Sequence, residues 1–104
     1  MLGLRLRTVS DRLELHISDV SDGALFKEIG EILRRGLDGS WLEKLDGLDQ
    51  RYWDLKVRES ILTLHLEHYL GIMLFPSPEC EGTSDANTLI EKAHQLLSAY
   101  PDAT

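Results

Sequence analysis

The residues most suited to chemistry lie in one short segment, His65-Leu66-Glu67-His68. In an extended strand His65 and Glu67 share a face, because successive side chains point to opposite faces. A turn directly after Glu67 would bring His68 toward them, and His16 is expected to point outward from another strand. Imidazole and carboxylate groups bind zinc and other transition metals. The sequence therefore allows a metal site made of His16, His65, Glu67 and His68.

A catalytic use of this segment is less well supported. Its spacing is not the helical H-E-x-x-H arrangement. His65 beside Glu67 could serve as a general base with a neighbouring carboxylate, but an outward sheet face provides no pocket by itself. The chain also has no G-x-S-x-G elbow, no glycine-rich phosphate loop and no G-x-G-x-x-G turn. We predict no catalytic residue and no cofactor, with the metal site kept as an alternative.

A second group of side chains favours binding of another protein. The alternation of residues 51–58 places Trp53 in the core and Tyr52 on the opposite face. If the strand order permits, one exposed polar and aromatic surface unites Arg12, Tyr52, Thr63 and His65. Tyrosine and arginine are enriched at the energetic centres of protein interfaces. The predicted binding residues are Arg12, Tyr52, His65 and Glu67.

Net charge narrows the class of partner. The 104 residues carry a formal charge of −7, which disfavours nucleic acid because phosphate binding needs a concentrated basic surface. Beyond Arg58 there are seven acidic residues and one basic residue, Lys92, so this part carries 1 − 7 = −6. Such a surface serves solubility and also suits a basic protein partner.

Hydropathy gives no sign of a membrane or export segment. No stretch approaches the roughly 18 apolar residues of a membrane helix. The first residues alternate apolar and basic side chains, whereas a signal peptide has an uninterrupted apolar run. We expect a cytoplasmic protein that does not bind membranes.

The single cysteine, Cys80, excludes an intramolecular disulfide and a zinc ribbon built from thiolates. It is expected to be exposed in a loop between Glu79 and Glu81. Two neighbouring carboxylates are not the electropositive setting of a reactive cysteine.

The elements that position these residues begin with a hairpin. Alternating apolar and polar residues predict strands over 3–9 and 12–18, joined at Ser10-Asp11. A helix follows a loop at 18–23, with Ser21 or Asp22 as its cap and Gly36 as its left-handed stop. Its apolar face consists of Leu25, Ile29, Ile32 and Leu33.

The middle of the chain predicts three more strands, over 40–45, 51–58 and 61–67, with a hairpin tip at Glu59-Ser60. Residues 68–75 either continue the last strand through a bulge at Gly71 or form a turn followed by a strand over 72–75. The turn is preferred, because a strand of 15 residues is long for a small domain. A final amphipathic helix, capped by Thr83 or Ser84, ends before Pro101.

These elements predict one α+β domain over residues 1–104. Its order is strand, strand, helix, three or four strands, helix. An antiparallel sheet of about five to six strands should carry both amphipathic helices on one face. In size, acidity and layout this plan resembles small stand-alone bacterial proteins, including some immunity proteins that neutralise toxins, although no functional residue carries over.

From this plan we expect a non-enzymatic protein-protein interaction protein, immunity- or adaptor-like, that uses the open sheet face or the acidic surface. A small metal- or ligand-binding protein is the alternative, and a small enzyme is the third reading. A homodimer through an edge strand or the open face is compatible with all three.

Overall fold

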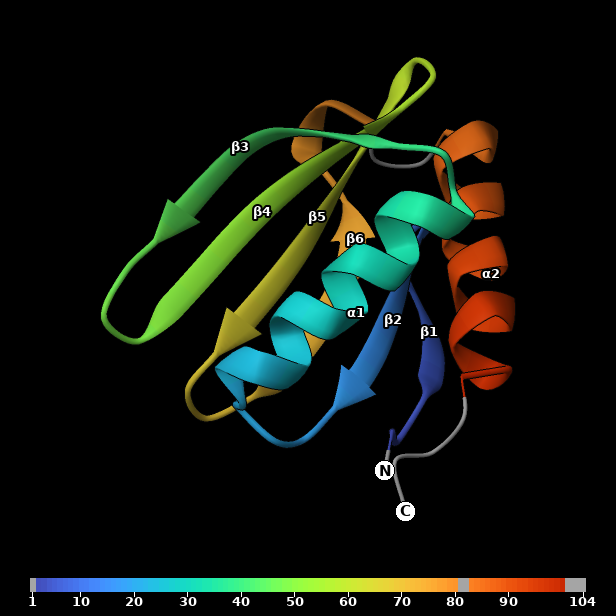
Figure 1. Cartoon of the computed structure of the whole chain (residues 1–104). Coiled ribbons are helices and arrows are strands. Elements are labelled where there is room, and N and C mark those ends of the chain that lie inside the picture. The colour runs from blue at the N-terminus through green and yellow to red at the C-terminus, as the bar shows by residue number, and fades with distance from the viewer. Residues whose placement is uncertain (1, 81–82, 101–104) are drawn as a thin grey trace.

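Six strands and two helices follow one another in the predicted order (Figure 1). The computed structural model describes residues 2–80 and 83–100. Its elements are β1 (Arg5–Val9), β2 (Arg12–Ser18), α1 (Gly23–Gly36), β3 (Ser40–Asp46), β4 (Gln50–Val57), β5 (Ser60–Glu67), β6 (Gly71–Pro76), the 3-10 helix η1 (Pro78–Cys80) and α2 (Ser84–Ser98). All strands pair antiparallel in the order β1-β2-β6-β5-β4-β3, and both helices cover one face. The predicted α+β fold is confirmed.

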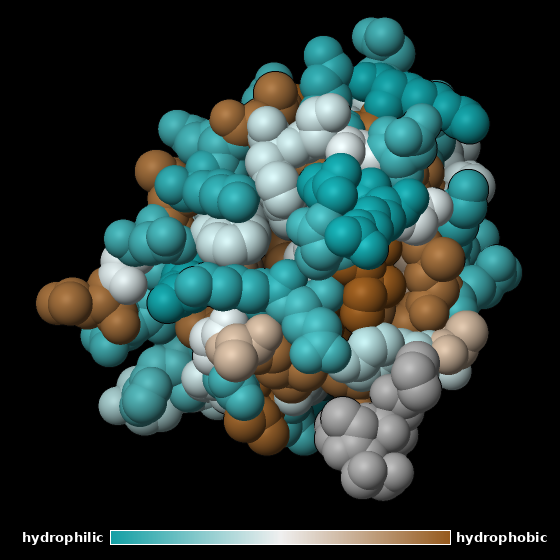
Figure 2. Space-filling view, viewed as in Figure 1, coloured by the Kyte–Doolittle hydropathy of each residue, from teal (hydrophilic) through white to brown (hydrophobic). Residues whose placement is uncertain are grey.

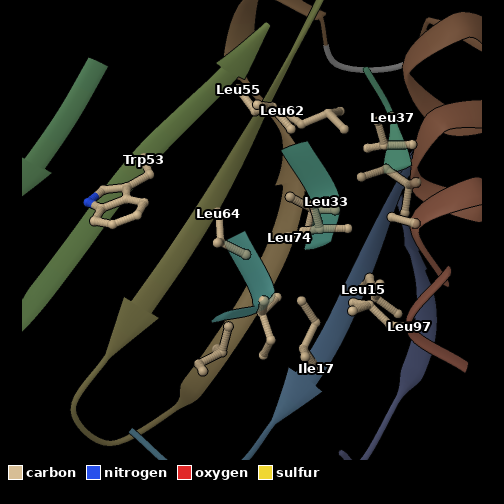
Figure 3. Close-up of a cluster of buried hydrophobic side chains, with 14 of the residues drawn as sticks. Leu15, Ile17, Leu33, Leu37, Trp53, Leu55, Leu62, Leu64, Leu74 and Leu97 are labelled. Atoms are coloured by element: carbon tan, nitrogen blue, oxygen red, sulfur yellow. The ribbon is translucent and has the colours of Figure 1, made fainter. Parts of the chain in front are cut away.

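The core lies between the sheet and the two helices (Figure 3). It is mainly aliphatic, and its fully buried side chains include Leu15, Ile17, Leu33, Leu62, Leu64 and Leu74. Trp53 belongs to it as predicted and meets Phe26 of α1 edge to face, with ring centroids 4.8 Å apart. Each large apolar side chain buried in this way contributes about 1.5–3 kcal/mol. The helices therefore hold one sheet face rigidly and leave the other uncovered.

The ambiguous segment after β5 turns back on itself. Residues 68–70 form a turn and β6 begins at Gly71, which confirms the preferred six-strand interpretation. The hairpin tip between β4 and β5 lies at Arg58-Glu59, so the predicted position at Glu59-Ser60 is wrong by one residue. Ser60 instead pairs with Val57 inside the ladder, and Arg58 takes the positive φ of 56° that closes the turn.

The end of α1 differs from the expected glycine stop. Gly36 is still helical, and the left-handed residue is Asp38, with a φ of 55°. Gly36 has another role, because a Cβ atom there would lie 2.6 Å from Cδ1 of Leu96 in α2. This glycine lets the two helices approach closely over the sheet.

The start of α1 gives a direct test of local structure. The Asp22 carboxylate accepts hydrogen bonds from the backbone N–H groups of Ala24, at 2.9 Å, and Leu25, at 3.4 Å. We expect Asp22→Ala to lower the free energy of unfolding by about 1 kcal/mol, measured by urea denaturation. Asp22→Asn keeps the accepting oxygen and should retain most of that stability. An equal loss in both variants would contradict the hydrogen-bond explanation.

Neither helix in the described part of the chain is long and apolar enough to span a membrane.

Candidate functional site

The sheet face opposite the helices is the candidate site. Strand register places one residue from each of five strands in a single row across this face: Arg5, His16, Met73, His65 and Tyr52. A neighbouring row contains Arg7, Glu14, Phe75 and Thr63. Polar and aromatic side chains thus cross five of the six strands. They lie on the face opposite the one that both helices cover (Figure 1).

Three of these side chains and Arg12 form a continuous chain of contacts, which we call the aromatic row: Tyr52, His65, Phe75 and Arg12. The rings of Tyr52 and His65 stack with centroids 4.2 Å apart and an angle of 11° between planes. His65 meets Phe75 edge to face at 5.9 Å, and the Arg12 guanidinium lies 5.1 Å from the Phe75 ring centre. Aromatic stacking and cation–π contacts of this kind hold such side chains in fixed positions.

The predicted group of Arg12, Tyr52, Thr63 and His65 is therefore brought together, with Phe75 as the link that the sequence reasoning missed. The alternation of residues 72–75 could have indicated that Phe75 shares a face with Met73, since Ile72 and Leu74 are both fully buried. Thr63 is fixed beside the row, where its hydroxyl donates to the Asp54 carboxylate at 2.7 Å.

Contrary to the expected exposed surface, His65 retains only 7% of its exposed area. Tyr52 stacks on its ring, and Phe75 packs against its edge. Neither ring nitrogen has a hydrogen-bond partner among the described protein atoms. Burial lowers the pKa of His65, and the negative charge of Glu67 opposes this shift only in part. His65 is thus a neutral ring near pH 7 within the aromatic row.

A groove of about 460 Å³ runs beside the aromatic row, over β1, β2 and β6. Its lining includes Arg5, Arg7, Glu14, His16, Leu70 and Met73. Arg7 pairs with Glu14 at 3.2 Å, while Asp19 accepts from Arg5 at 3.3 Å and lies 2.8 Å from Nε2 of His16. The arginine side chains are mostly exposed at the sheet edge, so both can reach a bound molecule.

The four candidate metal ligands are placed apart. Met73 lies between His16 and His65 in the register of the sheet. His68 sits in the β5–β6 turn, where its ring packs edge to face against Tyr69 at 4.7 Å. Within residues 2–80 and 83–100, no group of three or more His, Cys, Asp or Glu side chains could hold a metal ion. The metal site remains a prediction of the sequence that the geometry does not favour.

The structure corrects the expectation that Cys80 is exposed. The residue is buried, not exposed, because η1 folds the loop back against β5. Its sulfur accepts a hydrogen bond from the backbone N–H of Ile61 at 3.3 Å. Glu81 lies outside the described residues.

Comparison with known proteins identifies the family. Residues 5–95 match the model of a family described as protein of unknown function, DUF3630. The chain belongs to this family. The match begins at the first residue of β1 and ends within α2, so the aromatic row and the groove lie inside it. No curated protein and no solved structure matches the chain, so no activity is assigned by similarity.

Proposed function

We propose that this chain is a non-enzymatic, adaptor-like protein whose protein partner docks on the open face of the sheet. The observation that carries this proposal is the aromatic row on an uncovered face, with the groove beside it. Tyrosine and arginine held in fixed positions supply contact area with little loss of side-chain entropy on binding.

The chemistry of the groove supports a partner segment that combines carboxylates with an apolar side chain. Arg5 and Arg7 offer guanidinium groups at the sheet edge, and hydrogen bonds between guanidinium and carboxylate are among the stronger ones in proteins. Leu70 and Met73 provide the apolar part of the lining. The open face thus suits a different partner from the basic one that the overall charge favours.

Burial of the imidazole supports binding over catalysis. A general base must lie within hydrogen-bond reach of the proton that it removes. Both nitrogens of His65 are buried within the aromatic row, so a substrate on this face would not meet them. Cys80, the one thiol of the chain, is buried behind β5.

A photo-crosslinking experiment tests the proposal. A benzophenone amino acid replaces Tyr52 on the open face or, as a control, Lys27, which is exposed on α1. We expect the Tyr52 position to capture a defined protein in the source cells, and the Lys27 position not to capture it.

Charge reversal adds a matched comparison. Arg5→Glu with Arg7→Glu should reduce capture about tenfold, the effect of losing roughly 1.4 kcal/mol of binding free energy. Lys27→Glu with Arg35→Glu makes the same change in net charge on α1 and should leave capture unchanged. Equal capture from both crosslinking positions, or an equal loss in both charge reversals, would refute an open-face interface.

A further inference from the structure

A second surface lies at the end of the sheet where three chain reversals meet. Its members are Val20 in the β2–α1 loop, Leu48 in the β3–β4 turn, and Tyr69 and Leu70 in the β5–β6 turn; we call these four residues the turn-end surface. Their exposed fractions are 59%, 104%, 85% and 54%. Single exposed apolar residues are ordinary, whereas several exposed apolar residues on adjoining turns are typical of an interaction site. Figure 2 shows apolar residues at the tip of the β3–β4 turn, on the left.

Hydrogen bonds hold the three segments together. The backbone N–H of His68 donates to the carbonyl of Asp49 at 3.0 Å, which joins the β5–β6 and β3–β4 turns. The Ser21 hydroxyl donates to the carbonyls of Glu67, at 2.9 Å, and His68, at 2.5 Å, which joins the β2–α1 loop to the same turn. The three segments also line one hollow of about 170 Å³. The turn-end surface is therefore built on one connected support.

Charge separates this surface from the groove on the open face. Residues 20–22, 47–49 and 68–70 contain Asp22 and Asp49 and no lysine or arginine. Asp19, which precedes Val20, is paired with Arg5 of the groove. Two more carboxylates, Asp46 and Glu67, flank these turns at the ends of β3 and β5. One guanidinium, that of Arg51, also lines the hollow, and it lies 3.9 Å from the Asp46 carboxylate. Apolar side chains at the tips are thus bordered by negative charge.

We propose that the turn-end surface binds a basic amphipathic segment of a partner protein. Leucine or aromatic side chains of that segment cover Leu48 and Tyr69, and its lysine or arginine side chains meet Asp49 and the neighbouring carboxylates. An apolar centre surrounded by complementary charge is a general pattern of protein interfaces. The same carboxylates repel an anionic lipid surface, which favours a protein over a membrane as the occupant.

The surface adjoins the open-face interface, because Leu70 also lines the groove, but the two prefer partners of opposite charge. The protein can therefore hold an acidic segment over β1, β2 and β6 and a basic segment at the turns, which is the arrangement expected of an adaptor.

Titration of the ¹⁵N-labelled full chain with a model peptide tests this proposal. The probe is a peptide about 14 residues long, or about four helical turns, made of leucine and lysine with leucines on one helical face. The matching peptide with glutamate in place of lysine is the control. We expect the lysine peptide to bind at least about tenfold more tightly and to shift the amide resonances of residues 47–50 and 68–70.

Two serine variants distinguish binding at the turn-end surface from nonspecific hydrophobic binding of the peptide. Leu48→Ser, at a fully exposed position, should weaken binding of the lysine peptide about fivefold or more, roughly 1 kcal/mol. Leu42→Ser removes a leucine outside the surface that is 54% exposed, and it should leave binding unchanged. Equal affinity for both peptides, amide shifts confined to other surfaces, or equal weakening in both variants would overturn the proposal. Sedimentation of the chain with phosphatidylcholine vesicles that depends on Leu48 would overturn it in favour of a membrane.

Discussion

Gly71→Ala is expected to lower the free energy of unfolding by about 4 kcal/mol or more, a loss found only where a substitution breaks a specific structural feature. Gly71 has a φ of 92°, which L side chains rarely adopt. A Cβ atom at this position would lie 1.9 Å from the carbonyl oxygen of Ser18 and 2.9 Å from the Cα of Asp19. Both neighbours are backbone atoms, so no side-chain rotation relieves the overlap.

The position of Gly71 explains why the effect reaches the candidate site. Pairing between β2 and β6 shifts register between His16 and Ser18, and Gly71 begins β6 beside that shift. This seam joins the N-terminal hairpin to the four strands β3 to β6. Opening it would separate Arg5 and His16 from Met73 and His65, and the open face would lose its row.

Urea unfolding followed by tryptophan fluorescence measures the effect, because Trp41 and Trp53 pack together with ring centroids 5.3 Å apart. Gly3→Ala is the matched control, since a Cβ atom at Gly3 meets nothing within 4 Å. It should change stability by less than about 0.5 kcal/mol, as most exposed substitutions do. If Gly71→Ala lowers the free energy of unfolding by less than about 1 kcal/mol, the backbone must relax easily. That outcome would contradict the close approach to the backbone of Ser18 and Asp19.

Much of this architecture is encoded in short-range patterns. The alternation over residues 51–58 and 61–67 assigns Trp53 and Leu64 to the core, because a strand has only two faces. The helix cap at Asp22 follows from residue type, and the turn after Glu67 follows from the length that an unbroken strand would have. These features depend on residues within a few positions of one another, so sequence reasoning reaches them.

Features that depend on contacts between distant strands could not be predicted from these short-range patterns. Strand β6 inserts between β2 and β5, and only this order puts Phe75 between Arg12 and His65. The same arrangement buries His65 on a face without helices. Gly36 was assigned a local role at the helix end, whereas its neighbour is Leu96, which lies 60 positions later in the sequence (96 − 36 = 60). Local propensity carries no information about such contacts.

His65→Leu is expected to raise the free energy of unfolding at pH 7 by about 1–3 kcal/mol, because a buried polar group without a hydrogen bond costs about that much. Both imidazole nitrogens are buried without a partner among the described protein atoms. Leucine fills a similar volume between Tyr52 and Phe75 and has no polar atom to desolvate. Thermal and urea unfolding of the variant beside the wild type measure the gain.

The advantage of His65→Leu should grow on acidification. Because burial lowers the pKa of His65, the unfolded chain takes up a proton at a higher pH than the folded chain. The wild type therefore loses stability as the pH falls below about 6.5, the ordinary histidine pKa, toward the lower folded value. His65→Gln keeps a polar group without titration, so it should match the pH dependence of His65→Leu without the full gain at pH 7.

A binding measurement shows whether the stability that the buried imidazole costs is lost for the sake of partner binding. If the aromatic row is the interface, His65→Leu should weaken crosslinking from position 52 while it stabilises the fold, because the flat ring that supports the side chain at position 52 is lost. Opposite signs for stability and binding are the signature of a residue retained for function at the expense of stability. Unchanged crosslinking together with the stability gain would show that the open face binds without help from His65. A destabilised variant would show instead that stacking with Tyr52 outweighs the unpaired nitrogens.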